Sequence, residues 1–307
     1  MADPTSPLSR RTLLERAVAA AAAMVLPKPL AAWAGTNPDR HRLATWTAAL
    51  RAEKLSGPEA ALGRAAARVG ELAGGSPYQP GTLDAYLRAG GRPSGPEPLT
   101  LSLTRFDCVT LVESCLAVAR LAAQPGAPTW ARLGQEIERM RYRGGVRRGY
   151  PSRLHYFSEW ITDGEGRGLV RDLGTQLGAM DDARPLRFMT EHRDKYPALA
   201  DGGVFQDIAA MERRLDGHPR RVVPTERIAE VADRIETGDV LAFATAIPGL
   251  DVTHAAFAYR NAGGTLGVLH APLSGGVVEV ARAPLPEYVG AIRQATGILV
   301  ARPLRQP

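Results

Sequence analysis

The sequence predicts an α+β fold, because helix-like segments fill its first half and short β-like runs fill its last quarter. Apolar residues recur every three or four positions between 101 and 123, as on the buried face of a helix. From residue 239 onward, runs rich in Val, Ala, Leu and Phe alternate with Gly-rich turns, which is typical of antiparallel strands. The 307 residues, 45% apolar and 23% charged, suffice for one or two domains with a hydrophobic core and exclude a disordered, collagen-like or disulfide-stapled protein.

The first 34 residues resemble an export signal rather than part of the fold. Arg10 and Arg11 precede an apolar stretch at 17–26, and small residues up to Ala34 suit a signal peptidase. The segment around the two arginines resembles the twin-arginine export motif, and the apolar stretch is shorter than the roughly 20 residues of a membrane-spanning helix. We therefore expect a twin-arginine-type signal peptide over 1–34, export by that machinery to the periplasm or the extracellular space, and a mature chain without a membrane span.

The remaining elements are expected in the following order. Helical periodicity covers about 42–90, with breaks at 56–58 and 74–75, and a loop rich in Gly and Pro follows at 91–98. Asp107 suits the N-cap of the next helix, which runs to about 123. Two further helices are expected within 130–235, at 130–143 and 205–215. Strands are expected at 239–243, 252–259, 266–270, 277–280 and 297–302.

The two cysteines, Cys108 and Cys115, have different surroundings. Seven residues along one helix rise about 10.5 Å, whereas the Cα atoms of a disulfide lie within about 7 Å of each other. If the helix forms, both thiols are therefore free, and Cys115 is a small buried apolar residue. Cys108 lies at the helix start, where free N–H groups and the helix dipole favour a thiolate. Cys108 is therefore the candidate nucleophile.

A thiol nucleophile needs a base, which is usually histidine, and the base needs an orienting group. His41, His192 and His218 lie in polar surroundings and are expected at the surface. His254 and His270 lie on consecutive β-like runs, and neighbouring antiparallel strands place side chains about 5 Å apart. One imidazole could then orient the other, as a carboxylate does in the serine triad. The alternative from the residues alone is that each is a hydrogen-bonded core or surface histidine.

Several segments resemble a known family. Residues 106–113 (FDCVTLVE) resemble the nucleophile helix of NlpC/P60-type, papain-like cell-wall peptidases and amidases. Residues 237–243 resemble the Gly-Asp strand of that family, and 253–259 and 268–271 resemble its two histidine strands. Residues 149–160 (GYPSRLHYFSEW) resemble the DUF1460 branch, the N-acetylmuramoyl-L-alanine amidase-like family.

The resemblance covers roughly residues 80–303 and implies a fold and a domain organisation. It implies a papain-like NlpC/P60 core, in which the nucleophile helix packs on an antiparallel sheet or small barrel. An N-terminal helical region would cover 35–98 and the catalytic domain 99–307. Within that domain, residues from about 130 to 235 would form a large helical and loop insertion that resembles a lid over the substrate cleft.

The resemblance also implies a catalytic triad of Cys108, His254 and His270, with no cofactor and no metal. Cys108 would attack an amide carbonyl, His254 would hold the thiolate and protonate the leaving amine, and His270 would orient His254. Backbone N–H groups at the helix start would meet the oxyanion.

Five more residues are candidates for substrate binding. Arg153 would face a carboxylate of the stem peptide from a wall of the cleft. The alternative is a packed loop with a surface arginine. Asp107 is either a helix cap alone or also a hydrogen-bond partner of the substrate. The full set is Asp107, Ser152, Arg153, His155 and Tyr156.

These observations predict an exported cysteine amidase that cleaves the N-acetylmuramoyl–L-alanine bond of peptidoglycan or muropeptides. An endopeptidase for the γ-D-Glu–diaminopimelate bond would use the same chemistry and is the main alternative. The basic, aromatic and Gly-rich run at 141–153 and the net charge of +6 permit nucleic-acid binding, but the export signal argues against it. The three triad residues could bind zinc, but the sequence lacks the motifs that usually accompany such a site. In a non-catalytic peptidoglycan-binding module, the presence of all three triad residue types in order would be a coincidence.

Overall fold

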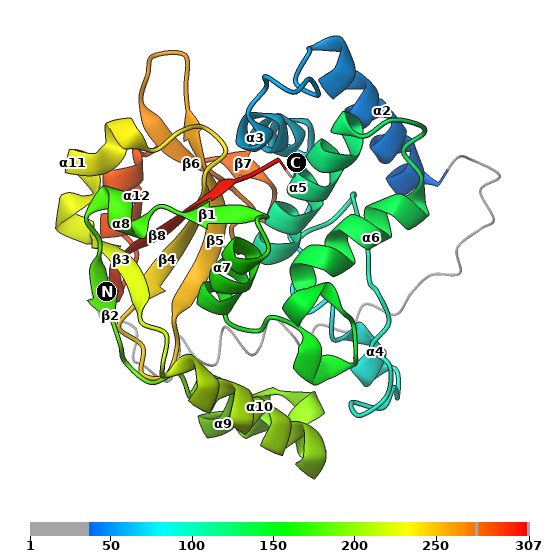
Figure 1. The fold of residues 1–307 in the computed structure, drawn as a ribbon, viewed down its shortest axis with the longest axis vertical. Helices are drawn as coiled ribbons and strands as arrows, with labels where there is room; N and C mark the ends of the chain where they lie inside the picture. The colour runs from blue at the N-terminus through cyan, green and yellow to red at the C-terminus, as the bar shows by residue number, and fades with distance from the viewer. Residues whose placement is uncertain (1–36, 274–275, 306–307) are drawn as a thin grey trace, which may run out of the picture. The chain divides into compact units, whose positions relative to one another are not determined.

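Helices cover both faces of an eight-stranded sheet in the computed structural model (Figure 1). The structure describes residues 37–273 and 276–305, so the predicted signal segment, 1–34, lies outside the described residues. The described helices are α2 (Pro38–Ala52), α3 (Leu62–Leu72), α4 (Ala85–Arg88), α5 (Cys108–Ala123), α6 (Trp130–Arg141), α7 (Phe157–Gly166), α8 (Gly174–Leu177), α9 (Phe188–Glu191), α10 (Gly202–Leu215), α11 (Ile228–Val231) and α12 (Leu285–Gly290). The described strands are β1 (Val170–Asp172), β2 (Met180–Asp182), β3 (Arg220–Pro224), β4 (Val240–Thr245), β5 (Val252–Arg260), β6 (Leu266–His270), β7 (Glu279–Val280) and β8 (Ala295–Pro303).

The sheet is antiparallel and open. Its strand order is β2-β3-β8-β4-β5-β6-β7, and β1 also pairs with β8. Strands β4 to β7 form the predicted meander, while the last strand, β8, lies beside β4 rather than beside β7. Of the two predicted forms, sheet or small barrel, the described strands form the open sheet. The sequence did not predict β1 and β2, because three-residue strands rich in charge carry no periodicity.

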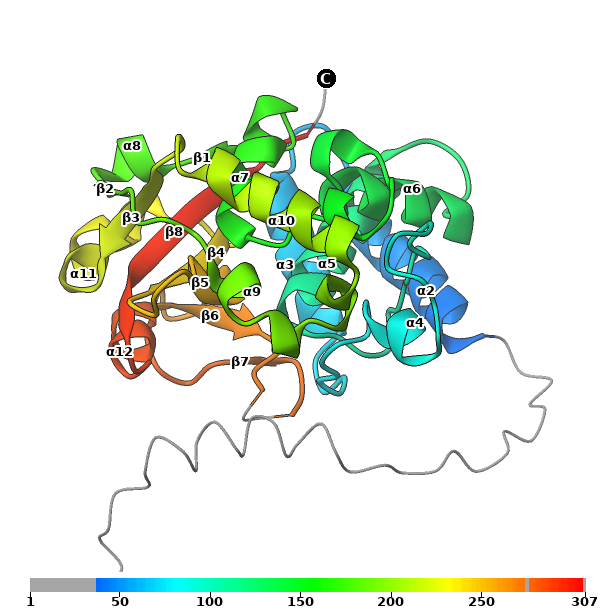
Figure 2. The same ribbon diagram turned by 90° about the horizontal axis from the view of Figure 1, so that it is seen from below.

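The two faces of the sheet bury different residues because side chains alternate along each strand. On β4, Val240, Ala242 and Ala244 belong to the core beneath α2, α3, α5 and α6. Leu241 and Phe243 point the other way, into a second core shared with α8, α11 and α12. Figures 1 and 2 show these two groups of helices on opposite sides of the sheet.

Helix α5 is the central helix, and its start is well defined. The Asp107 carboxylate accepts a hydrogen bond from the Thr110 N–H (2.7 Å), and the Thr110 hydroxyl accepts one from the Asp107 N–H (2.9 Å). This reciprocal cap confirms Asp107 as the N-cap and begins the helix at Cys108. Cys108 and Cys115 lie on one continuous helix and are both free, as predicted.

The predicted insertion at 130–235 contributes both to the helices that cover the sheet and to the sheet itself. Leu133 and Ile137 of α6 and Trp160 of α7 lie in the core above the sheet, and β1 and β3 extend the sheet itself. Helices α9 and α10 instead build a separate small core, which includes Tyr150 and Tyr156 and lies at the bottom of Figure 1. Whether the whole of 130–235 is an insertion relative to other proteins stays a prediction.

Residues 37–273 and 276–305 contain neither a membrane-spanning helix nor a cluster of potential metal ligands. None of these helices combines the length and apolar composition needed to span a bilayer. Over the same residues, no group of three or more His, Cys, Asp and Glu side chains is arranged to hold a metal ion.

Candidate active site

Two histidines on neighbouring strands form the centre of the candidate site. His254 lies on β5 and His270 ends β6, and His254 Nε2 is 2.9 Å from His270 Nδ1. Their rings meet edge to face with centroids 5.1 Å apart. His254 is partly exposed, whereas His270 is only 1% exposed. The strand register thus brings the two imidazoles together, as the spacing predicts. His254 uses Nε2 for this contact, so Nδ1 is the ring nitrogen that remains for a second partner.

An apolar and aromatic wall surrounds this pair. Phe243 on β4 lies directly opposite His254, and the register of β4 and β5 shifts just after it. The Phe243 ring contacts His254 (5.6 Å between centroids) and Tyr288 of α12 (5.5 Å). The Tyr288 hydroxyl lies 3.2 Å from His270 Nδ1, the same atom that contacts His254. Three elements, β4, β6 and α12, therefore hold the base in one orientation.

Burial keeps both imidazoles neutral. It lowers the pKa of His254 to about 3, with a smaller contribution from His270, and lowers the pKa of His270 to about 4. At neutral pH each ring therefore carries one proton, and one ring donates while the other accepts. His254 can accept a proton at Nδ1 only when its own proton is on Nε2 and is donated to His270.

Cys108 is the first residue of α5 and is partly exposed. The N–H group of Ala255 on β5, directly after His254, lowers the pKa of the Cys108 thiol, as do the N–H groups of Val109 and of Cys108 itself. Burial and then the negative charge of Asp107 outweigh these groups and raise the pKa of Cys108 to about 12. The sequence suggested a thiolate from the helix start alone. The surroundings instead favour a neutral thiol.

No hydrogen bond joins the Cys108 sulfur to His254 in the described part of the chain. Catalytic hydrogen bonds are often long in free enzymes and tighten when substrate binds. The resting site is thus a neutral thiol close to a neutral imidazole. The proton must then move from Cys108 while the bond to substrate forms.

These pKa directions predict how Cys108 reacts with iodoacetamide at different pH values. Only the thiolate is alkylated, and its fraction rises about tenfold per pH unit below the thiol pKa. We expect the alkylation rate of the free protein to rise continuously from pH 6 to pH 9, as followed by intact-mass spectrometry. A rate that levels off below pH 8 would show instead a preformed thiolate–imidazolium pair.

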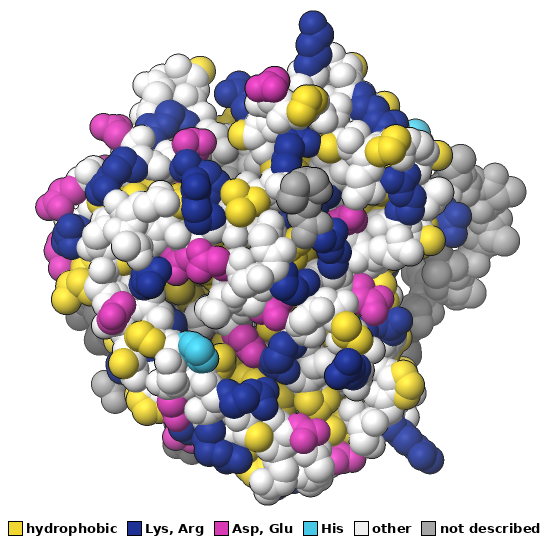
Figure 3. Space-filling model, in the orientation of Figure 1, with side chains coloured by type: hydrophobic (Ala, Val, Ile, Leu, Met, Phe, Trp, Pro, Cys, Tyr) yellow, Lys and Arg dark blue, Asp and Glu magenta, His cyan; other side chains and the backbone are white. Residues whose placement is uncertain are grey.

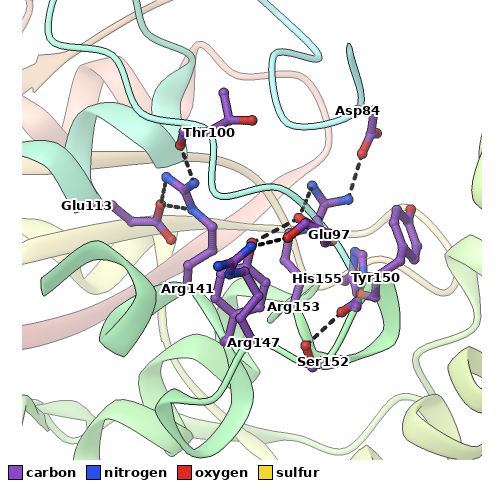
Figure 4. Close-up of polar contacts among 12 residues, drawn as sticks. Asp84, Glu97, Thr100, Glu113, Arg141, Arg147, Tyr150, Ser152, Arg153 and His155 are labelled. Atoms are coloured by element: carbon purple, nitrogen blue, oxygen red, sulfur yellow. Dashed lines mark hydrogen bonds and ion pairs between the residues drawn. The ribbon is translucent and has the colours of Figure 1, made fainter. Parts of the chain in front are cut away.

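Arg153 lies in a second cluster, shown in Figure 4. Its Nη2 is 2.6 Å from an Asp84 oxygen and its Nη1 is 3.4 Å from a Glu97 oxygen. The guanidinium also lies over the Tyr150 ring, 4.7 Å from its centroid. Arg153 is only 6% exposed. Its positive charge is therefore already matched by two carboxylates of the protein, and it is not offered to a ligand in this structure.

The other candidate substrate residues near Arg153 are bonded to the protein in the same way. Ser152 accepts from the Arg148 N–H (2.9 Å) and donates to the Gly149 carbonyl (2.7 Å). His155 Nε2 contacts the Tyr150 carbonyl (2.9 Å), and the Tyr156 hydroxyl donates to the buried Glu212 (2.7 Å). The structure thus places Cys108, His254, His270 and Asp107 at the start of α5 and on β5 and β6. The other candidate residues lie in the loop cluster of Figure 4 and in the small core that includes Tyr156.

The basic run at 141–153 also has internal partners. Arg141 binds Glu113 (2.7 Å), and Arg143 binds Glu159 (2.6 Å), in addition to the contacts of Arg153. On the molecular face in Figure 3, Lys and Arg side chains are interspersed with Asp and Glu side chains. The arginines that suggested nucleic-acid binding therefore serve largely to hold buried carboxylates.

The sequence reasoning did not find Tyr78, Phe243 and Tyr288. Tyr78 is partly exposed, and burial together with the charges of the nearby Cys108 and Asp107 raises its pKa. Phe243 sits in an ordinary strand pattern, and Tyr288 follows a proline-rich turn with no motif around it. Only the packing of segments that are far apart in the chain reveals these residues.

Several solved structures are similar to this chain. A solved N-acetylmuramoyl-L-alanine amidase from Bacteroides uniformis is 28% identical, over 80% of this chain and 99% of that one, with a TM-score of 0.71. A solved putative xylanase from Bacteroides fragilis is 30% identical, over 76% and 99% of the two chains, with a TM-score of 0.69. A Legionella pneumophila protein of the DUF1460 family shares the fold at 16% identity, over 87% and 95%, with a TM-score of 0.62. No curated protein matches the chain.

The family match covers most of the described fold. The model of the N-acetylmuramoyl-L-alanine amidase-like family, AmiA-like, matches residues 68–298. This range includes Cys108 on α5 and the two histidines on β5 and β6. It also includes the loop cluster around Arg153. The chain therefore belongs to the N-acetylmuramoyl-L-alanine amidase-like family.

Proposed function

We propose that the protein is an exported cysteine amidase that hydrolyses the amide bond between N-acetylmuramic acid and L-alanine in peptidoglycan or muropeptides. The observation that carries this proposal is a thiol at the first position of α5, beside the hydrogen-bonded pair His254–His270. Membership of the AmiA-like family supports the choice of bond. The twin-arginine-like segment at 1–34 supports export to the periplasm or the extracellular space.

The mechanism follows from the two imidazoles. His254, with its proton on Nε2 and donated to His270, accepts the Cys108 proton at Nδ1 while the sulfur attacks the carbonyl carbon of the muramoyl group. The first N–H groups of α5, at Cys108 and Val109, have no intrahelical partner, and we assign them as the donors to the oxyanion. His254 then gives its proton to the nitrogen of L-alanine, and the C–N bond breaks. Water hydrolyses the thioester, which frees the muramic acid carboxyl group and restores the thiol.

The papain-like NlpC/P60 core belongs to the same proposal. Helix α5 packs with its first turn against β5, the arrangement that a helix-borne thiol and a strand-borne base require. The alternative endopeptidase would use the same thiol and imidazoles, because cleavage of either amide bond needs the same steps. Which of the two amide bonds is cleaved therefore depends on the residues that line the cleft and not on the triad.

Product analysis tests the proposal directly. We expect mass spectrometry of digested muropeptides to show a free stem peptide that begins with L-alanine, together with a sugar that carries no peptide. A new amino terminus at diaminopimelate would replace the amidase with the endopeptidase. Intact muropeptides after prolonged incubation with protein whose Cys108 is alkylatable would reject both enzymes.

The two histidines are expected to differ in importance. His254→Ala removes the group that takes and returns the proton, so we expect a loss of kcat almost as large as that of a thiol-free variant. His270→Asn keeps a hydrogen-bond acceptor beside His254 Nε2 and should retain measurable kcat, about 10- to 100-fold below wild type. Steady-state kinetics on a muramoyl-peptide measure both. Wild-type kcat in His270→Ala would show that another group orients His254.

A further inference from the structure

A polar cavity of about 260 Å³ lies beside the first turns of α5. It is enclosed by α5, by residues 79–85 and by residues 100–105. Its walls contain two arginines, one glutamine and five hydroxyl side chains, and no Asp or Glu of the described residues lines it. Its polar lining includes Gln79, Thr82, Arg105, Thr110, Ser114 and Arg141.

We call this cavity the Arg105 pocket. Its two arginines differ in whether a carboxylate balances their charge. Arg141 is buried, and its charge is matched by the buried Glu113, with N–O distances of 2.7 Å (Figure 4). Arg105 is exposed, and its hydrogen-bond partner among the described residues is the neutral amide oxygen of Gln79, at 3.3 Å. The nearby Asp107 carboxylate is engaged in the cap of Thr110. Among the described residues, Arg105 thus forms no ion pair with a carboxylate.

The Arg105 pocket lies within reach of a substrate bound at the thiol. Arg105 precedes Cys108 by three residues, and the Gln79 N–H donates to the Phe106 carbonyl (2.8 Å), which fixes that loop against the start of α5. Gln79, in the wall of the pocket, follows Tyr78, which pairs with Phe106 in an isolated bridge and whose pKa is raised by burial and by the nearby Cys108. An extended peptide advances about 3.3–3.6 Å per residue. The second residue of a stem peptide thus lies roughly 7 Å from the scissile bond.

We propose that the Arg105 pocket binds the free α-carboxylate of the second residue of the stem peptide, a glutamate linked onward through its γ-carboxyl. This inference rests on the proposed function, because it assumes that L-alanine follows the scissile bond. A planar guanidinium with a weak neutral partner can exchange that partner for a carboxylate, which it holds through two hydrogen bonds. The hydroxyls around it supply further donors. Arg153 cannot take this role while its charge is matched by Asp84 and Glu97.

A matched pair of substrates tests this assignment. Both are N-acetylmuramoyl-L-alanyl-D-glutamate derivatives with the γ-carboxyl blocked as a methylamide. One has a free α-carboxylate and the other an α-carboxamide. We expect wild type to prefer the carboxylate by about 10-fold or more in kcat/KM. Arg105→Ala should lower kcat/KM about 10- to 100-fold for the carboxylate and less than about threefold for the carboxamide.

Two control variants and one binding measurement complete the test. Arg92→Ala removes an exposed arginine from the neighbouring loop and should leave the preference unchanged, whereas Arg105→Lys should retain only part of it. Equal losses on both substrates, an unchanged preference in Arg105→Ala, or the same effect in Arg92→Ala would overturn the assignment. If wild type releases neither peptide, the proposed function fails instead. Titration calorimetry with the free L-alanyl-D-glutamate γ-methylamide then tests the pocket alone, and equal affinity in wild type and Arg105→Ala would reject it.

Discussion

Replacing Cys108 with alanine is expected to abolish amide hydrolysis, with a loss of at least about 10³-fold in kcat. Without the sulfur no thioester can form, and His254 has no proton to accept. Product release from a muramoyl-peptide, followed by mass spectrometry, measures this loss. The variant should fold as wild type does, because the Cys108 side chain is partly exposed and the helix cap belongs to Asp107 and Thr110.

Cys115 provides the matched control within the same helix. It is 1% exposed in the core above the sheet. Cys115→Ala should keep nearly full activity and lower the free energy of unfolding by about 1–2 kcal/mol, because a small cavity replaces the sulfur. Equal loss of activity in the two variants would point to a shared structural role and remove Cys108 as the nucleophile.

The parts of the site that sequence could predict depend on local patterns. The Asp-Cys pair before an apolar helical face predicts both the cap and the first helical residue, since capping involves residues only three apart. The two histidines are predicted as neighbours because a short Gly-rich turn joins their strands. The four strands of the meander follow for the same reason.

The parts that sequence could not predict depend on residues far apart in the chain. The Asp84 partner of Arg153 lies 69 positions away, so the sequence showed an available arginine where the fold has a buried, paired one. Likewise, the helix start alone favoured a thiolate at Cys108, but burial by the packed chain outweighs the N–H groups there. Local composition does not reveal the degree of burial, and burial decides both cases.

Arg153 should therefore matter first for stability. Arg153→Ala leaves the Glu97 carboxyl group, 1% exposed, without its cation, and also frees Asp84. Removing one partner of a buried ion pair costs about 3–5 kcal/mol, which we expect as the loss in free energy of unfolding measured with urea. Arg148→Ala, an exposed arginine in the same loop, should change it by less than about 0.5 kcal/mol.

The pH dependence of this loss identifies its cause. Burial raises the pKa of Glu97, and the charge of Arg153 is the largest influence that lowers it. In Arg153→Ala the folded-state pKa of Glu97 should rise further above its unfolded value. Ionised Glu97 then destabilises the fold, and protonation relieves the cost. The stability difference from wild type should be smaller at pH 4.5 than at pH 8.

A second substitution separates this role from direct substrate binding. In the Arg153→Ala background, Glu97→Gln removes the unmatched charge but keeps the shape of the side chain, so it should recover part of the lost stability at pH 8. Muramoyl-peptide kinetics of the same variants provide the comparison. Wild-type stability in Arg153→Ala, combined with a raised KM, would show that the guanidinium leaves Asp84 and Glu97 to bind a substrate carboxylate. Lower stability, with rescue by Glu97→Gln, assigns Arg153 to holding the loop at 84–97 against the loop at 150–156, the two segments that it joins.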